Sequence, residues 1–183
     1  SLADNEVSKV EIDDSEEFYI PRMKWNNKAH SLVFTKMNRH QSRLELIEVD
    51  AATLKLNTLL KEESASYIDV DDDLTFLSDN SFIFTSEKDG YNHVYHYSKK
   101  GKLINQITKG NWEVTEYYGY DSTSDRIFYQ SVENGSINRD VYSIKLNGTQ
   151  KRRLTQNEGT NNADFSANFT YFINTFSSAT TPY

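Results

Sequence analysis

The sequence predicts an all-β fold made of short antiparallel strands, and three observations support this prediction. Tyr, Phe and Trp make up 13% of the 183 residues, and such side chains favour strands because they pack well on a pleated surface. Short runs of alternating apolar residues recur along the chain between turn residues. No window repeats apolar residues at the i, i+3, i+4, i+7 spacing of an amphipathic helix.

The first strands are expected in the N-terminal third of the chain. Leu32–Thr35 reads as a strand followed by a turn near Asn38, and Leu44–Val49 forms the next alternating run. A short helix within residues 42–62 is the alternative, since residues 51–56 have fair helix propensity. A strand, a turn and a strand are favoured, because Asp50–Thr53 is turn-like and strand-forming residues flank it.

Two further hairpins are predicted in the middle of the chain. Their strands are Ser81–Ser86 with Val94–Tyr97, and Arg126–Ser131 with Val141–Leu146. The turn Lys88-Asp89-Gly90 joins the first pair. Asn147-Gly148 follows the second pair and is a strong signal for a two-residue hairpin turn.

These strands repeat as a group. Strand starts recur at spacings of 50 and 47 residues, at Arg43, His93 and Asp140. Leu-Thr-type segments follow them at spacings of 48 and 47 residues, at Leu59–Glu62, Ile107–Gly110 and Leu154–Asn157. A period of about 40–50 residues with four strands is typical of a propeller blade. The sequence therefore predicts a partial β-propeller of about three to four blades, each with four antiparallel strands.

The predicted blades are residues 18–62, 67–110 and 112–157, followed by an incomplete fourth blade at 161–183. A β-sandwich of hairpins is the alternative, because regular strand spacing fits it as well. Three and a half blades do not close the usual ring, and they leave terminal edges open to pairing. Residues 1–183 are therefore expected to be a propeller fragment of a longer protein, or to cover their ends by forming a homo-oligomer.

Composition excludes several kinds of function. A net charge of −7, with 27 acidic against 20 basic residues, argues against a nucleic-acid partner. The absence of cysteine excludes disulfides, thiolate zinc sites and a cysteine nucleophile. No apolar run approaches the roughly 18 residues of a membrane span. Ser1–Val10 lacks a signal-peptide pattern, so either the protein is cytoplasmic or its N-terminus was removed or not included.

Several segments carry short motifs. Tyr19–Trp25 includes Pro21, Arg22 and Trp25, and the turn after the next strand includes Asn38, Arg39 and Gln41. Ser86–Tyr95 includes Glu87, Gly90, Tyr91, His93 and Tyr95, and Thr108–Thr115 includes Gly110, Trp112 and Glu113. Together and in this order, and continued by Gly159–Ser166 and Phe176–Pro182, these segments resemble the propeller of dipeptidyl peptidase IV-type enzymes of the prolyl oligopeptidase family.

Packing explains these motif residues without catalysis. Gly90 can supply a positive φ in a tight hairpin. Tyr91 and Tyr95 can pack between blades, and Trp112 is large enough to wedge between neighbouring blades. Glu113 is available there to bind backbone donors or an arginine. The motif residues are therefore interpreted as structural, with direct substrate contact as the alternative.

Catalytic chemistry is not found in this chain. The resemblance implies a serine nucleophile in a Gly-x-Ser-x-Gly elbow of a C-terminal α/β-hydrolase domain, and no such sequence occurs here. None of the four histidines has a serine partner in such an elbow, and they are His30, His40, His93 and His96. No catalytic residue, no cofactor and no individual substrate-binding residue is therefore assigned.

Two clusters invite a metal interpretation. His93 and His96 lie three residues apart on a strand, so they point to opposite faces and are expected to be packed or hydrogen-bonded. Asp69–Asp73 lacks the glycine and glutamate of a calcium-binding EF-hand loop, since Leu74 and Asn80 stand at those positions. A solvated inter-blade loop is favoured over adventitious cation binding, and no metal site is assigned.

Two segments bear on peptide binding. The resemblance implies that a pair of glutamates holds the N-terminal ammonium of the substrate. That pair has a different sequence context from Glu16-Glu17, so the role is not carried over. Tyr67–Asp73 occupies the region where animal relatives place a pocket-lining Arg-Phe-Arg stretch. A substrate-pocket role for this loop stays open, and no residue in it is assigned.

The resemblance implies a serine exopeptidase that releases N-terminal dipeptides, X-Pro or X-Ala, from peptide substrates. The partner hydrolase domain would perform the acyl transfer, while this segment would gate and shape access to it. Bacterial relatives are mostly exported, so a periplasmic or otherwise exported location is expected. The alternative is a non-enzymatic periplasmic binding scaffold of the TolB-like propeller type, and the gene downstream of Tyr183 would distinguish the two.

Overall fold

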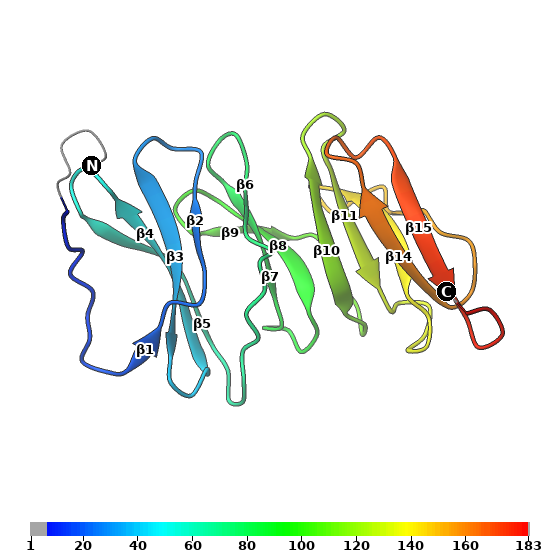
Figure 1. The fold of residues 1–183 in the computed structure, drawn as a ribbon, viewed down its shortest axis with the longest axis horizontal. Helices are drawn as coiled ribbons and strands as arrows, with labels where there is room; N and C mark the ends of the chain where they lie inside the picture. The colour runs from blue at the N-terminus through cyan, green and yellow to red at the C-terminus, as the bar shows by residue number, and fades with distance from the viewer. Residues whose placement is uncertain (1–6, 183) are drawn as a thin grey trace. The chain divides into compact units, whose positions relative to one another are not determined.

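The computed structural model describes residues 7–182. These residues form fifteen strands in four antiparallel sheets and no helix, which confirms the prediction of an all-β partial propeller. The chain divides into two compact units between Val70 and Asp71. The first unit contains one sheet and the second contains three (Figure 1).

The first unit is built on a single five-stranded sheet. Its strands are β1 (Phe18–Tyr19), β2 (Met23–Trp25), β3 (Ser31–Asn38), β4 (Arg43–Asp50) and β5 (Leu56–Glu63). β1 and β2 both pair with β3, and the order continues through β4 to β5. The core on one face consists of Phe34, Ile47 and Val49, with Val10 and Ile12 packed against them. The segment before β1 therefore covers part of the sheet.

A tight turn joins β4 to β5. The Asp50 carboxylate accepts hydrogen bonds from the N–H groups of Ala52 and Thr53, at 3.0 and 2.9 Å. Leu54 then takes a φ of 58°, and its N–H donates to the Asp50 carbonyl. This turn confirms the strand-turn-strand prediction and excludes the short helix, because Asp50 supplies the turn's hydrogen bonds.

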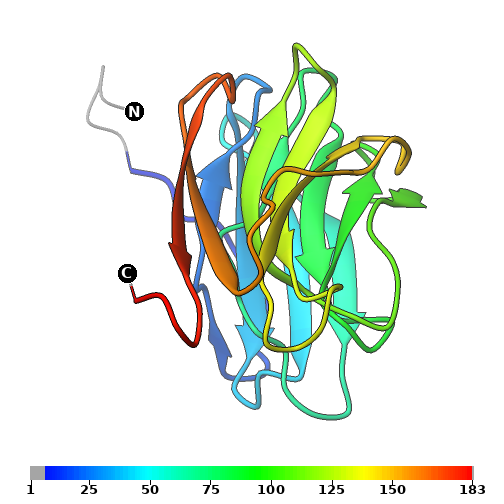
Figure 2. The ribbon, with the colours of Figure 1, turned by 90° about the vertical axis from the view of Figure 1, so that its right-hand side faces the viewer.

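The second unit contains three sheets. The first holds β6 (Thr75–Phe76), β7 (Phe82–Ser86), β8 (His93–Tyr97) and β9 (Leu103–Gln106). The second holds β10 (Val114–Asp121), β11 (Arg126–Ser131), β12 (Asp140–Lys145) and β13 (Arg152–Arg153), and the last holds β14 (Thr160–Phe165) and β15 (Phe172–Ser177). An isolated bridge from Arg139 to Thr160 places the last two sheets side by side (Figure 2).

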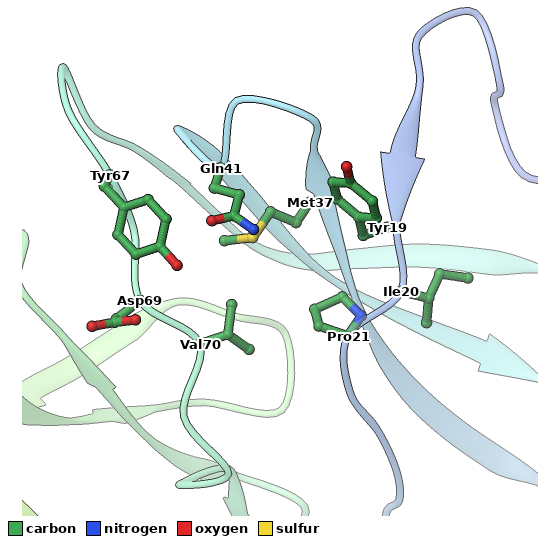
Figure 3. A pocket seen from close by; sticks show the side chains of 8 residues that line it. All are labelled: Tyr19, Ile20, Pro21, Met37, Gln41, Tyr67, Asp69 and Val70. Carbon is green, nitrogen blue, oxygen red and sulfur yellow. The ribbon is translucent and has the colours of Figure 1, made fainter.

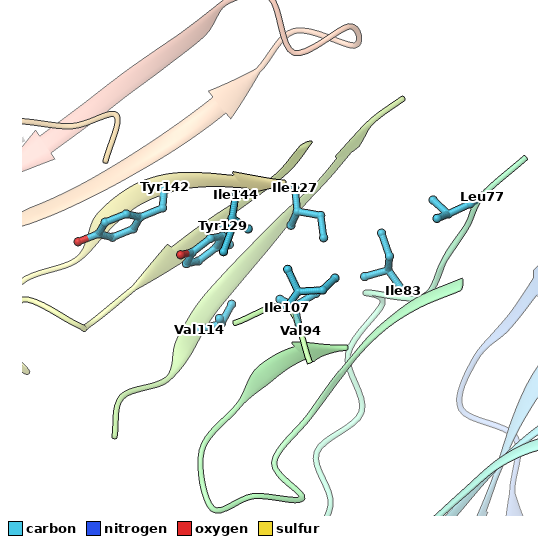
Figure 4. Packing of buried hydrophobic residues seen from close by; sticks show 9 residues of the cluster. All are labelled: Leu77, Ile83, Val94, Ile107, Val114, Ile127, Tyr129, Tyr142 and Ile144. Atoms are coloured by element: carbon cyan, nitrogen blue, oxygen red, sulfur yellow. The ribbon is translucent and has the colours of Figure 1, made fainter. Parts of the chain in front are cut away.

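The main core of the second unit lies between the β6–β9 and β10–β13 sheets. Its buried members are Leu77, Ile83, Val94, Ile107, Val114, Ile127, Tyr129, Tyr142 and Ile144 (Figure 4). On the other face of β11, the Phe128 ring lies 5.0 Å from Phe165 and 4.8 Å from Phe169. β11 is therefore covered on both faces, because successive side chains of a strand point in opposite directions.

The predicted repeat reappears in the structure. β4, β8 and β12 begin at Arg43, His93 and Asp140, the residues at which the sequence places recurring strand starts. In each of the three larger sheets this strand pairs with the strand before it and the strand after it. The period of 47–50 residues is thus a repeat of one sheet.

The turn after β12 differs from the prediction. A two-residue type I′ turn needs a positive φ at both central residues, and of Asn147 and Gly148 only Gly148 has one, at 79°. The Gly148 N–H donates to the Lys145 carbonyl, and the Lys145 N–H donates to the Thr149 carbonyl. These bonds close a three-residue loop. The two-residue prediction is wrong because Leu146 belongs to the loop and not to the strand.

Candidate functional site

A bulge interrupts the first strand of the first unit. β1 and β2 pair with the same strand, but three residues, Ile20–Arg22, lie between them where β3 has only two. Such an unequal count is a β-bulge, and Pro21 suits it because proline has no N–H for the ladder. The Arg22 carbonyl accepts the N–H of Thr35 at 2.9 Å. Trp25, on β2, is 65% exposed.

Asn38 holds the hairpin between β3 and β4. Its side-chain oxygen accepts the N–H groups of Ser42 and Arg43, both at 2.9 Å. Its carbonyl accepts the N–H of Gln41, which takes a φ of 54°. The side chains of Arg39 and Gln41 contribute no hydrogen bond to this turn. The motif therefore contains one residue that shapes the hairpin and two whose side chains point elsewhere.

A cavity of about 400 Å³ opens between the bulge, the hairpin and the loop that follows β5. Its lining consists of Tyr19, Ile20, Pro21, Met37, Gln41, Tyr67, Asp69 and Val70 (Figure 3). The Ile68 N–H donates to the Gln41 carbonyl at 2.8 Å and joins the loop to the hairpin. The segment Tyr67–Val70, whose role the sequence leaves open, forms one wall of this cavity.

A second cavity, of about 350 Å³, shares Tyr19 with the first and is lined in part by the Glu16-Glu17 pair. Glu17 lies 3.5 Å from the Nε of Arg39, and Glu16 forms an ion pair with Arg43. Both carboxylates are more than half exposed. Each carboxylate therefore has an arginine partner from the neighbouring hairpin, and an ammonium group would compete with that arginine.

The two motifs of the second unit meet at His93. Its Nε2 lies 3.1 Å from the Gly110 carbonyl, and its Nδ1 lies 3.1 Å from the Thr108 hydroxyl. A carbonyl only accepts, so Nε2 carries the proton and the Thr108 hydroxyl donates to Nδ1. The same hydroxyl oxygen accepts the N–H of Val94 at 2.9 Å. His93 therefore ties the start of β8 to the segment that leads into β10.

Trp112 fills the space beside His93. The two rings meet edge-on with centroids 4.9 Å apart, and the indole stacks on Tyr129 at 6.3 Å. A Cβ at Gly110 would lie 2.2 Å from the indole nitrogen, so only glycine fits there. Trp112 thus wedges between neighbouring sheets, while the side chain of Glu113 is exposed.

Gly90 shapes the hairpin between β7 and β8. It takes a φ of 102°, and its N–H donates to the Glu87 carbonyl at 2.8 Å. Tyr95 is buried, and the ammonium of Lys88 lies 3.7 Å from its ring centroid. Tyr91 is 40% exposed, so Tyr95 is the core residue of these two tyrosines.

Asp73 is not the solvated residue that the sequence predicts. Desolvation by burial raises its pKa to about 6, a hydrogen bond from Thr85 at 2.8 Å opposes this shift, and the nearby Asp71, Glu116 and Asp72 carboxylates reinforce it. Asp71 and Asp72 are exposed as expected. The prediction of a solvated loop is therefore wrong for its last acidic residue, which folds back onto β7.

A buried serine and histidine lie together in the second unit, but in the wrong order for catalysis. The Ser81 hydroxyl donates to the Asp79 carboxylate at 2.6 Å and lies 2.9 Å from the Nε2 of His96. The hydroxyl proton points to the aspartate, so the imidazole donates to the serine and does not take its proton. In a hydrolase triad the histidine stands between the other two groups. We therefore assign this trio a structural role.

Within residues 7–182, no three His, Cys, Asp or Glu side chains gather closely enough to hold a metal ion. The same residues contain no helix with the length and apolarity of a membrane span.

Comparison with known proteins gives a consistent result. The whole chain, residues 1–183, matches the family model described as the dipeptidyl peptidase IV (DPP IV) N-terminal region. The chain is similar to the "Probable dipeptidyl peptidase 4" of Aspergillus flavus, with 26% identity over 196 residues that cover all of this chain and 25% of the relative. It is also similar to the "Probable dipeptidyl-aminopeptidase B" of Phaeosphaeria nodorum, with 27% identity over 85% of this chain and 19% of the relative.

A solved structure resembles the chain more closely. The crystal structure of Porphyromonas gingivalis dipeptidyl peptidase 4 superimposes with a TM-score of 0.90 at 39% sequence identity. The match covers 97% of this chain and 25% of that one. The chain therefore spans about a quarter of the length of the curated relatives and of the solved structure.

Proposed function

The chain belongs to the dipeptidyl peptidase IV N-terminal region family, and on this premise we propose that it is a non-catalytic propeller segment of a serine exopeptidase. The complete protein releases N-terminal dipeptides, X-Pro or X-Ala, from peptides. A separate α/β-hydrolase domain carries the catalytic triad. Each sheet described above is one blade, or part of one, and the blades gate and shape access to that domain.

The cavity of the first unit carries the proposal that this segment meets the substrate. Its walls come from a bulge, a hairpin and a loop, and each is held without a ligand. The bulge is joined to β3 through Thr35, the hairpin is held by Asn38, and the loop is joined to the hairpin through Ile68. A cavity with walls already in place loses little entropy when a peptide binds.

The activity is tested on the complete protein with a Gly-Pro chromogenic substrate and its N-acetylated form. We expect release from the free amine only, because an exopeptidase of this type recognises the N-terminal ammonium. Equal turnover of both substrates would indicate an endopeptidase. No turnover of either would favour the non-enzymatic scaffold.

The gating role is tested with one N-terminal sequence presented in two ways. The sequence is placed on a short peptide and on a stably folded protein. We expect the dipeptide to be released from the peptide at least tenfold faster, because rigid blades restrict entry to short or unfolded chains. Similar rates would remove gating from the proposal and leave the exopeptidase activity untouched.

The proposal also covers location and assembly. We propose that the protein is exported, as the resemblance implies, and that it forms a homo-oligomer. Cell fractionation tests the location, and light scattering on the complete protein tests the assembly. A monomer recovered from the cytoplasm would contradict both parts.

A further inference from the structure

Gln41 occupies a backbone position that its residue type does not favour. Its φ of 54° lies in the left-handed region, where glycine and asparagine are the usual residues. The hydrogen bonds that shape the turn come from Asn38 and from backbone groups. Gln150 has a similar φ of 52°, so glutamine is compatible with this conformation, and Gln41 differs from Gln150 in lining a cavity.

The side chain of Gln41 faces the cavity of the first unit. Figure 3 shows its amide and the Tyr67 ring on one side of the cavity, with Val70 and Pro21 opposite. Among residues 7–182, neither the side-chain amide of Gln41 nor the hydroxyl of Tyr67 has a hydrogen-bond partner. Two polar groups are therefore available to something that enters the cavity.

The rest of the lining is largely apolar. Ile20, Pro21, Met37 and Val70 supply most of it, and Asp69 is the one charged residue among the eight that line the cavity. An amide both donates and accepts, and so does a phenol hydroxyl. These two groups match the N–H and C=O of a peptide unit, and the apolar walls match an apolar side chain attached to it.

We propose that this cavity binds one apolar residue of a peptide substrate, whose main chain hydrogen-bonds to the Gln41 amide and the Tyr67 hydroxyl. This inference rests on the proposed function, and it names the residue class recognised and the side chains that recognise it. Gln41 is then a substrate-binding residue. Asparagine at this position would suit the backbone, but its side chain is one methylene shorter and would extend less far into the cavity.

The first experiment uses the complete protein and the variants Gln41→Asn, Tyr67→Phe and His40→Ala. Asparagine suits a positive φ, so Gln41→Asn shortens the side chain and leaves the hairpin intact. His40 lies in the same hairpin outside the cavity and is the matched control. We expect the first two variants to lower kcat/KM by about 3- to 10-fold, mainly through KM, with no loss in Tm.

The second experiment measures binding by calorimetry with a peptide made non-cleavable by reduction of its second peptide bond. Glycine is replaced by leucine at one position at a time. We expect one position at which leucine binds about tenfold tighter than glycine, and we expect Val70→Ser to reduce that advantage. Gln41→Asn and Tyr67→Phe should weaken binding of the whole peptide series.

The outcomes separate this inference from the proposed function. If Gln41→Asn and Tyr67→Phe behave like His40→Ala in both experiments, or if leucine gives no advantage anywhere, the inference fails while the exopeptidase proposal stands. If the wild-type protein releases no dipeptide, but Gln41→Asn and Tyr67→Phe weaken peptide binding as expected, the proposed function fails and the peptide site stands.

Discussion

Two neighbouring sheets of the second unit build the same joint with different chemistry. His93 and Asp140 are the first residues of β8 and β12, and both are fully buried. Each accepts a hydrogen bond from a threonine hydroxyl, that of Thr108 or Thr155. Each threonine in turn accepts the N–H of the following valine in the strand, at 2.9 and 3.1 Å. In the second and third repeats, the Leu-Thr-type segment therefore supplies a threonine that makes the same hydrogen bond to the start of the neighbouring strand.

The joints differ in what completes them. At the His93 joint, the imidazole donates to a backbone carbonyl and packs against Trp112. At the Asp140 joint, the carboxylate accepts from Arg153 at 2.8 Å and from Asn134 at 3.0 Å, and Asn161 of β14 lies 3.4 Å away. The His93 joint contacts Trp112, just before β10, through aromatic packing. The Asp140 joint contacts Asn161 of β14 through the charged carboxylate. The threonine is common to both joints, and the group beside it differs.

Removal of the carboxylate at the Asp140 joint should have the largest effect. Asp140→Ala removes a fully buried carboxylate that accepts hydrogen bonds from the partly exposed Arg153 and from Thr155, and we expect a loss of about 2–4 kcal/mol because hydrogen bonds to charged groups are worth about 1.5–3 kcal/mol each. Urea denaturation of the complete protein measures this loss. Asp164→Ala, at an exposed position of β14, is the control and should change stability by less than about 0.5 kcal/mol. Equal effects of the two variants would contradict the charge-based joint.

Removal of the imidazole should cost less. His93→Ala deletes two neutral hydrogen bonds and the edge contact with Trp112, and we expect a loss of about 1–3 kcal/mol in the same measurement. His40→Ala, at an exposed position without a positive φ, is the control. A loss at His93 larger than the loss at Asp140 would reverse the ranking and would show that the aromatic wedge is the stronger joint.

Asp73 sharpens the comparison, because it is a half-buried carboxylate that forms no ion pair within residues 7–182. Its pKa is raised from 3.8 to about 6, so the folded state holds the proton more tightly than the unfolded state does. Stability should therefore fall as the pH rises from about 4 to about 6, and then stay level. Asp73→Asn removes this dependence and should stabilise the protein by about 1–2 kcal/mol at pH 7.5, with no difference near pH 4.

The pH series has its own control. Asp164→Asn changes the same net charge at an exposed position of β14 and should leave the slope between pH 4 and 6 close to that of the wild type. Thermal unfolding of the three proteins across this range measures the effect. If Asp73→Asn destabilises the protein at pH 7.5, the carboxylate has a favourable partner and the comparison with Asp140 fails.

Local patterns explain which parts of the fold were predictable. The starts of β4, β8 and β12 follow from alternation and period, and the β4–β5 turn follows from Asp50, because each depends on residues close in sequence. The loop at Gly148 is one residue longer than the Asn-Gly pattern predicts, since Asn-Gly is compatible with more than one loop length. The solvated interpretation failed at Asp73, whose partner on β7 lies twelve residues away.

The candidate site was less accessible to sequence reasoning. The motif residues Asn38, Arg39 and Gln41 share a hairpin, and nothing in the sequence separates the one that holds the turn from the one that faces a cavity. Gln41 combines a left-handed φ with a side-chain amide that has no hydrogen-bond partner within residues 7–182. Both are properties of the folded chain.

By itself, the sequence determined the all-β class, the period of the sheets and the family resemblance, because strand alternation, turn residues and motif order are local properties of the chain. Only the tertiary structure decided what His93 and Asp140 bind, that Asp73 is desolvated, and that a bulge, a hairpin and a loop enclose one cavity in the first unit. The physical reason is that burial and hydrogen-bond partnership depend on segments that lie far apart in the sequence and meet only when the sheets form.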